Sequence, residues 1–279
     1  MIFFNKTGFA IGAEGVMIGE LPQYFDVSFE VANAIANMGI PLGIMVMPLV
    51  TQFLLDVYGW RGTLMILGAL LLHLIVCGAV LTPVKREHLE NKFFCKNDEA
   101  RCHQEYESNE TRSSNYFDFI LFKDMRFISL LLYNVGQGYC ITGWLIYLVP
   151  HAIDIGFSST AAAFLATLGG VGNLIACILY PLVKQTLSDK QILYSMSTLG
   201  CVALMIDPIF AVSRSYIGLM ISSVSLGFGR GMAILAAYTL IRVTIEQDKI
   251  SNAFIWFTAS YSIGSLSSGF LSGIFSIIS

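Results

Sequence analysis

A few polar and charged residues lie inside long apolar runs, where they could bind a solute or an ion. Arg230 lies between small neighbours in the middle of such a run, and Glu14 lies near the middle of the first apolar segment. Asn134 and Gln137 are three residues apart and would share one face of a helix. Charged groups in hydrocarbon are costly, so they mark solute and ion pathways. We predict substrate-binding roles for Arg230, Asn134 and Gln137, and proton or ion coupling for Glu14.

Several of these residues also have a purely structural explanation. Arg230 could pair with helix carbonyls or with a carboxylate of another helix, such as that of Glu14. Asp207 precedes Pro208 near the end of an apolar run, so we expect its carboxylate to reach toward the outer membrane interface. His73 on its apolar helix is more typical of a packing histidine than of a proton relay.

The composition predicts an all-α integral membrane protein. Of 279 residues, 55% are hydrophobic and 13% are charged, and the mean hydropathy is +0.69. An ordinary soluble domain carries about a quarter charged residues. The net charge of -3 argues against a nucleic-acid partner, so we expect the lipid bilayer and a small solute as partners instead. We find no signal-peptide pattern at the start of the chain and no convincing strand pattern.

The sequence contains no recognisable arrangement of enzymatic residues. It has no metal-ligand cluster, no nucleophile elbow and no phosphate-binding glycine loop, so we predict that it is not an enzyme and needs no cofactor. Four of the six cysteines lie in apolar runs. Cys95 and Cys102, the latter beside His103, lie in a polar stretch, but their spacing matches no standard zinc pattern. We therefore expect no metal site.

Eight apolar segments are long enough to cross a membrane as helices. They cover residues 7–25, 31–55, 63–81, 127–150, 160–184, 190–212, 216–241 and 252–277. A turn at residues 56–62 separates the second from the third. We predict three parts: residues 1–84 end an N-terminal bundle with three helices, 85–126 form a charged central loop, and 127–279 form a C-terminal bundle with five helices.

The distribution of Lys and Arg predicts the orientation. The side that holds the central loop carries twelve of them in its loops, against three on the other side. Positively charged loops face the cytosol, so the central loop should be cytosolic. Asn109-Glu-Thr111 is a glycosylation acceptor by pattern, and at this location it should stay unmodified.

Two groups of motifs resemble a known transporter family. In the first half these are Tyr24-Phe25, Val31-Ala-Asn-Ala-Ile-Ala-Asn-Met-Gly39, Pro41-Leu-Gly43 and Tyr58-Gly-Trp-Arg-Gly62. In the second half they are Tyr147-Leu-Val-Pro150, Ala161-Ala-Ala-Phe-Leu165 and Ile250-Ser-Asn-Ala253. They are similar, in order, to the fourth to eleventh helices of monocarboxylate transporters. The chain departs from the family pattern at residues 26–30, where the family has basic residues.

The resemblance implies a major facilitator superfamily-like helical bundle, with about eight of twelve transmembrane helices in this chain. It also implies a secondary transporter or symporter that moves a small organic solute, possibly a monocarboxylate, by alternating access. The plasma membrane and a single-pass accessory glycoprotein partner would follow from the same resemblance. The alternative is a truncated or diverged relative that does not transport and acts as a membrane interaction protein. These eight helices alone are expected not to catalyse transport.

The resemblance also points to one pair of positions in the site. The eighth helix of the family carries an Asp and, one turn later, an Arg, which handle the proton and the substrate carboxylate. The corresponding residues here are Asn173 and Cys177, and neither carries that charge. Asn173 remains a substrate-binding candidate, whereas Arg230 becomes the deep cation of the second half. We therefore expect little response of uptake to a pH gradient.

Overall fold

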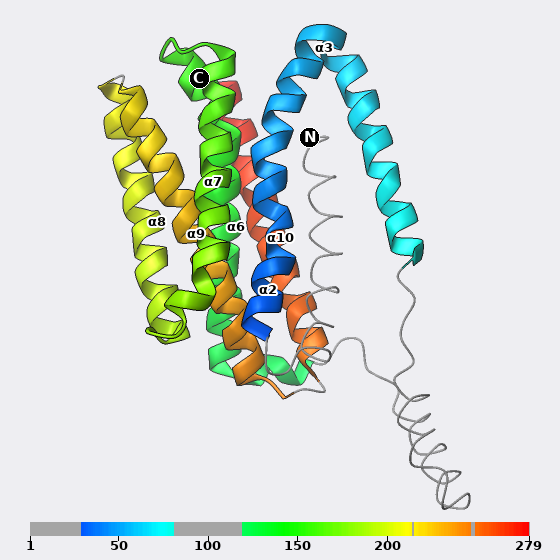
Figure 1. Cartoon of the computed structure of the whole chain (residues 1–279), viewed down its shortest axis with the longest axis vertical. Helices are drawn as coiled ribbons and strands as arrows, with labels where there is room; N and C mark the ends of the chain where they lie inside the picture. Colours follow the sequence, from blue (N-terminus) through cyan, green and yellow to red (C-terminus); the bar gives the residue numbers. More distant parts are fainter. Residues whose placement is uncertain (1–28, 81–118, 214, 247–248, 279) are drawn as a thin grey trace, which may run out of the picture. The chain divides into compact units, whose positions relative to one another are not determined.

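The computed structural model describes residues 29–80, 119–213, 215–246 and 249–278, and within these ranges every regular element is a helix. The helices are α2 (Phe29–Asn37), α3 (Gly39–Val80), η1 (Phe119–Lys123), α6 (Met125–Asp154), α7 (Ser159–Val183), α8 (Asp189–Val212), α9 (Tyr216–Thr244) and α10 (Ile250–Ile278). Figure 1 shows α6 to α10 as long helices. The prediction of an all-α protein is confirmed.

The five later segments agree with their predicted bounds to within a few residues. The segment 31–55 differs, because α2 ends at Asn37 and α3 starts at Gly39, with a turn at Met38. The turn expected at residues 56–62 is also shorter than predicted. Only Gly59 leaves the helical conformation within α3, at φ 64°, a backbone angle that glycine adopts at little cost. The predicted segment 7–25 lies outside the described residues.

Four helical stretches of the described residues are long and apolar enough to cross a membrane: Phe29–Leu70, Ser159–Val183, Asp189–Phe210 and Tyr216–Thr244. Many of their large apolar side chains are exposed, such as Ile178 at 55% and Met205 at 77%. In water such exposure would be unfavourable, whereas in a bilayer these side chains contact lipid. The helices thus have the character of membrane spans.

The described residues fall into two compact units, one with residues 29–53 and 119–278 and the other with residues 54–80. In the first unit, α9 packs closely against α7 and α8, and α6 packs against α10. The α7–α9 pair is so close that a Cβ on Gly227 would lie 1.9 Å from the carbonyl oxygen of Gly169. At the α6–α10 pair, a Cβ on Gly264 would lie 2.0 Å from the carbonyl oxygen of Val135. Small residues at these positions allow the close packing typical of membrane helices.

Candidate functional site

One narrow pocket lies inside the first unit, between the first part of α3 and helices α6, α7 and α9. Its lining residues are Ile44, Ile141, Trp144, Leu145, Gly169, Asn173, Leu226, Gly227 and Arg230. The empty space in and at the mouth of the pocket amounts to about 270 Å³. Only about 20 Å³ of it can hold the centre of a water molecule. In this conformation the pocket therefore admits only water-sized groups. Asn173 and Arg230 are the two residues with polar side chains among otherwise largely apolar lining residues.

Arg230 brings a positive charge to this pocket. Its side chain is half-buried, and Nη2 donates a hydrogen bond of 3.4 Å to the hydroxyl of Tyr261 on α10. Its guanidinium carbon lies 5.9 Å from the centre of the Tyr261 ring. Among the described residues, no carboxylate oxygen lies within 4.0 Å of Arg230. Glu14, its predicted partner, lies outside the described residues, so that pairing stays a prediction.

Asn173 on α7 reaches the same pocket and is 5% exposed. Its Oδ1 accepts a weak hydrogen bond of 3.9 Å from the thiol of Cys177, one turn later on α7. A Cβ on Gly231 would lie 2.5 Å from this Oδ1, so a glycine at that position of α9 makes room for the amide. The close α7–α9 packing thus brings Asn173 and Arg230, which are 57 residues apart in the sequence, to one pocket.

The other two predicted contacts do not line this pocket. Asn134 is 1% exposed, and its Nδ2 donates to the carbonyl oxygen of Phe257 at 2.6 Å and to Oγ of Ser260 at 3.3 Å. It therefore ties α6 to α10. Gln137 is half-buried on α6 and is not among the lining residues. Solute contact by Asn134 and Gln137 remains a prediction that the pocket geometry does not favour.

Two residues with structural predictions have contacts that the sequence did not reveal. Asp207 is half-buried and accepts a hydrogen bond from Oγ of Ser222, which joins α8 to α9. The carboxylate thus has a partner within the bundle, in contrast to the predicted reach toward the interface. His73 is exposed within the second unit, and its Nδ1 lies 3.2 Å from the carbonyl oxygen of Ala69 on the same helix. Its role as a packing histidine rather than a proton relay stays a prediction.

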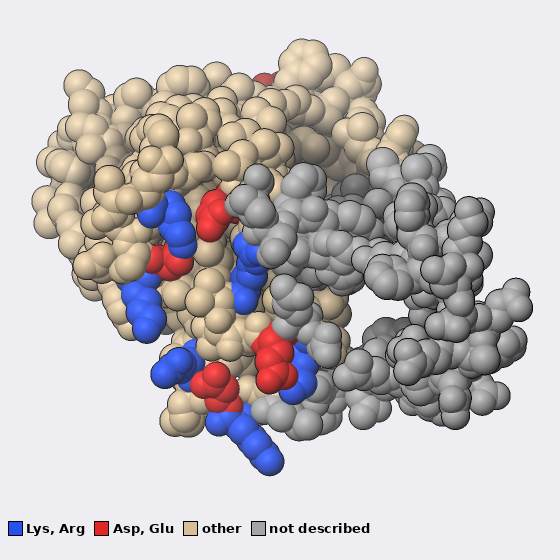
Figure 2. Space-filling model, turned by 60° about the horizontal axis from the view of Figure 1, so that its bottom comes forward, with Lys and Arg blue, Asp and Glu red and all other residues tan. Residues whose placement is uncertain are grey.

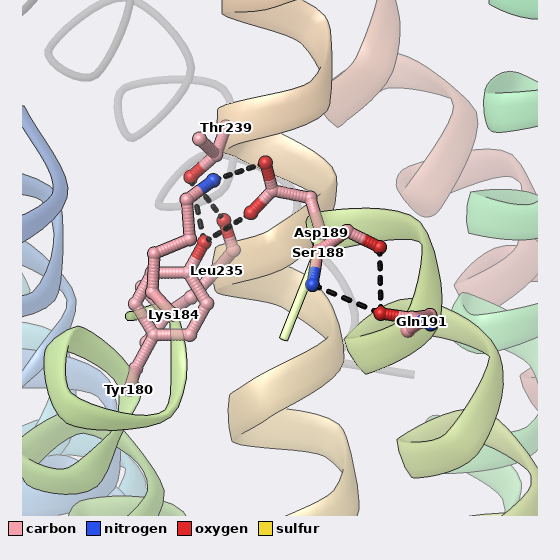
Figure 3. Close-up of polar contacts among 7 residues, drawn as sticks. All are labelled: Tyr180, Lys184, Ser188, Asp189, Gln191, Leu235 and Thr239. Carbon is pink, nitrogen blue, oxygen red and sulfur yellow. Dashed lines mark hydrogen bonds and ion pairs between the residues drawn. The ribbon is translucent and has the colours of Figure 1, made fainter. Parts of the chain in front are cut away.

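A polar cluster ties α7, α8 and α9 together at the end of the bundle where charged side chains gather (Figures 2 and 3). The buried hydroxyl of Tyr180 donates to Oδ1 of Asp189 at 3.1 Å and lies 2.8 Å from Oγ1 of Thr239. Lys184 forms an ion pair with Asp189. This is the end that we predicted to face the cytosol.

The same end holds a contact between α2 and α9. The guanidinium carbon of Arg242 lies 4.6 Å from the centre of the Phe29 ring, and Phe29 is completely buried. A cation above an aromatic face is a favourable arrangement. Phe29 belongs to the stretch where the chain departs from the family pattern of basic residues, and here an aromatic ring contacts the basic side chain of another helix.

Comparison with known proteins identifies the family. The sequence pattern of the Major Facilitator Superfamily matches residues 22–276, so the chain belongs to this superfamily of multi-pass membrane transporters, which are not enzymes. The prediction of a monocarboxylate-transporter-like protein is confirmed.

The relatives that it matches include several monocarboxylate transporters. The chain is 27% identical to Monocarboxylate transporter 4 of Gallus gallus over 241 residues, which covers 84% of this chain and 47% of that protein. It is 30% identical to Monocarboxylate transporter 12 of Mus musculus over 178 residues, or 58% and 36% of the two chains. With Monocarboxylate transporter 2 of Homo sapiens the identity is 25% over 263 residues, or 91% and 54%. The chain spans about half the length of these curated relatives.

Proposed function

We propose that this chain forms the solute site of a carrier for small organic anions, a monocarboxylate-transporter-like secondary transporter. The observation that carries the proposal is that Arg230 is one of the residues lining a narrow pocket with apolar walls. Burying an Arg in a membrane helix costs about 2.5–3.5 kcal/mol on insertion scales, so the charge calls for a compensating anion. Its partner among the described residues is the neutral hydroxyl of Tyr261, which leaves guanidinium N–H donors for a solute.

The chemistry of the pocket favours a monoanion with an apolar body. A planar guanidinium can bind a carboxylate through two parallel hydrogen bonds. The amide of Asn173 adds a neutral N–H donor, because its oxygen already accepts from Cys177. Apolar side chains such as those of Trp144 and Leu226 then surround the rest of the solute. A second carboxylate would meet no second cation in this pocket, so a dicarboxylate would be a poorer ligand.

The location of the pocket supports alternating access. Ile44 lies on α3, from the part of the chain that we assign to the N-terminal bundle, whereas the other lining residues lie on helices of the C-terminal bundle. In transporters with two bundles the solute binds between them, and the bundles rock around the site. Rocking of α3 against α7 and α9 would widen this narrow pocket toward one side of the membrane and then toward the other.

The finer assignments rest on the family resemblance. We propose a plasma-membrane location and, as a partner, a single-pass accessory glycoprotein. Coupling to protons would require a titratable group, and Asn173 supplies none at the position of the family's Asp. Glu14 remains the candidate for proton or ion coupling, and without its participation the carrier would act as a facilitator of anion movement.

The proposal is tested by equilibrium binding of radiolabelled butyrate to the purified chain in lipid nanodiscs, and by uptake in a twelve-helix carrier that contains this chain. Arg230→Ala should abolish binding and uptake, and Arg230→Lys should weaken both, because Lys lacks the planar fork. The matched control is Arg242→Lys, which changes an Arg on the same helix outside the pocket and should leave binding intact. Full binding by Arg230→Ala would refute the proposed site.

A further inference from the structure

Two buried asparagines on α2 have side-chain atoms without a hydrogen-bond partner among the described residues. Asn33 is 0% exposed and Asn37 is 3% exposed. Nδ2 of Asn37 donates to the backbone oxygen and to Oδ1 of Asn33, both at 2.9 Å. Two oxygens thus face the Asn37 amide nitrogen, which fixes the orientation of the amide and leaves its Oδ1 as a free acceptor. Asn33 retains a free donor in Nδ2.

Such atoms call for an explanation, because a buried polar atom without a hydrogen-bond partner destabilises the folded chain. The surroundings offer little compensation. Asn33 and Asn37 are buried on α2, which packs on α7 and α9, and the buried core shared by these helices contains several alanines: Ala176, Ala233, Ala236 and Ala237. Alanine side chains donate and accept nothing. The free atoms therefore suit a polar ligand that enters between α2 and these helices.

Contacts between α3 and α7 place the two asparagines relative to the pocket. Oγ1 of Thr167 donates to the carbonyl oxygen of Met45 at 3.3 Å, and a Cβ on Gly170 would lie 3.0 Å from the carbonyl oxygen of Pro41. The helices therefore run antiparallel (Figure 1), and each turn toward the start of α3 pairs with a turn toward the end of α7. One more turn brings Asn37 level with Asn173.

This register puts Asn37 at the level of the end of the pocket that Asn173 forms, although Asn37 is not itself among the lining residues. One turn toward the start of α2, Asn33 comes level with Cys177. One turn before Asn33, Phe29 contacts Arg242 at this end of the bundle. The polar groups along this face of the helices are therefore ordered: the cation of Arg230, the amide of Asn173, and then the free acceptor of Asn37.

We propose that Asn37 is a specificity-determining residue of the carrier. It accepts, through Oδ1, a hydrogen bond from a hydroxyl or ammonium group of the solute whose carboxylate Arg230 binds. A solute with a carbonyl at the same carbon offers only acceptors and leaves Oδ1 of Asn37 without a partner. The site therefore selects hydroxy acids over the matching oxo acids. This inference rests on the proposed transport function and adds the chemical class of the solute.

The test compares the binding of radiolabelled 2-hydroxybutyrate and 2-oxobutyrate to the purified chain in lipid nanodiscs. A neutral hydrogen bond contributes about 0.5–1.5 kcal/mol, so the wild-type chain should bind the hydroxy acid roughly three- to tenfold more tightly. Asn37→Met should remove this preference by weakening the binding of the hydroxy acid alone. Thr258→Val changes a buried polar residue of α10 outside the pocket and should keep the preference.

A second measurement separates solute recognition from a structural role. In Asn33→Leu with Asn37→Leu both partners of the pair become apolar, so the melting temperature of the solute-free chain should stay the same or rise. Asn134→Leu should lower it, because it removes the α6–α10 tie. A fall in the double variant as large as that in Asn134→Leu would mean a structural role and overturn the proposal.

The binding results distinguish the two proposals. An unchanged preference in Asn37→Met, or no preference in the wild-type chain, would overturn the specificity role alone. A wild-type chain that binds neither acid would refute the proposed function and the specificity role together. Loss of the preference in Asn37→Met, with the binding of the oxo acid retained, is the result that supports the role of Asn37.

Discussion

An acid placed at Asn173 should turn the pocket into a proton-sensitive site. Asn173 and Arg230 line the same pocket from adjacent helices, so Asn173→Asp would place a carboxylate next to the guanidinium. Opposite unit charges attract by about 4 kcal/mol at 4 Å and about 2 kcal/mol at 8 Å when the effective dielectric constant is about 20. The new carboxylate would compete with the solute anion for Arg230. Even the smaller value corresponds to a loss of affinity of about 30-fold.

Protonation of the new carboxyl removes its charge and frees the guanidinium. The affinity of Asn173→Asp for butyrate should therefore be low at about pH 8 and recover toward about pH 5.5, while the solute, with an ordinary carboxyl pKa of about 4–5, stays mostly ionised. The assay is equilibrium binding in nanodiscs across this range. Asn173→Ser is the neutral control and should show little pH dependence. Wild-type affinity at every pH in Asn173→Asp would refute the placement of Asn173 beside Arg230.

Three further predictions concern packing, stability and orientation. Gly227→Ala should lower the free energy of unfolding by about 1–3 kcal/mol, and with it the melting temperature, because its Cβ would meet the α7 backbone. Gly200→Ala should leave the melting temperature unchanged, because its Cβ would have no atom within 4 Å. Tyr180→Phe removes two buried hydrogen bonds and should cost about 1–3 kcal/mol in thermal unfolding, whereas the exposed Tyr194→Phe should cost nothing measurable. Protein from mammalian cells should show no glycosidase-sensitive mass at Asn109; a mass shift that disappears in Asn109→Gln would reverse the predicted orientation.

The helices could be predicted from the sequence because a membrane span leaves a strong signal. Long apolar runs with short polar breaks fix where each helix starts and ends, and α6 to α10 follow that signal. Arg230 could be predicted for a related reason, since a charge inside an apolar run is rare and costly. The short break at Gly59 was less predictable, because the polar residues around it remain helical.

The partners across helices could not be predicted in the same way. Periodicity places Asn134 and Gln137 on a helix face, but it does not say which neighbouring helix that face meets, and α10 takes up Asn134. Tyr261 and Asn37 were not singled out, because the sequence does not show that Tyr261 meets Arg230 or that Asn37 has a buried acceptor without a partner among the described residues. Their importance depends on Arg230 and on the register of α3 against α7, which are properties of the folded chain.

The contact between Gly169 and Gly227 has a consequence for how the solute range of the proposed carrier could be changed. A wall built by backbone against backbone offers no side chain to enlarge or trim, and Arg230 is attached to that wall. Size selectivity therefore has to be altered from the side chains of the other lining helices, such as Ile44 on α3 and Trp144 on α6. Smaller residues at those two positions would make room for a bulkier hydrocarbon body while the cation keeps its position, so the carrier could be redesigned for new acids.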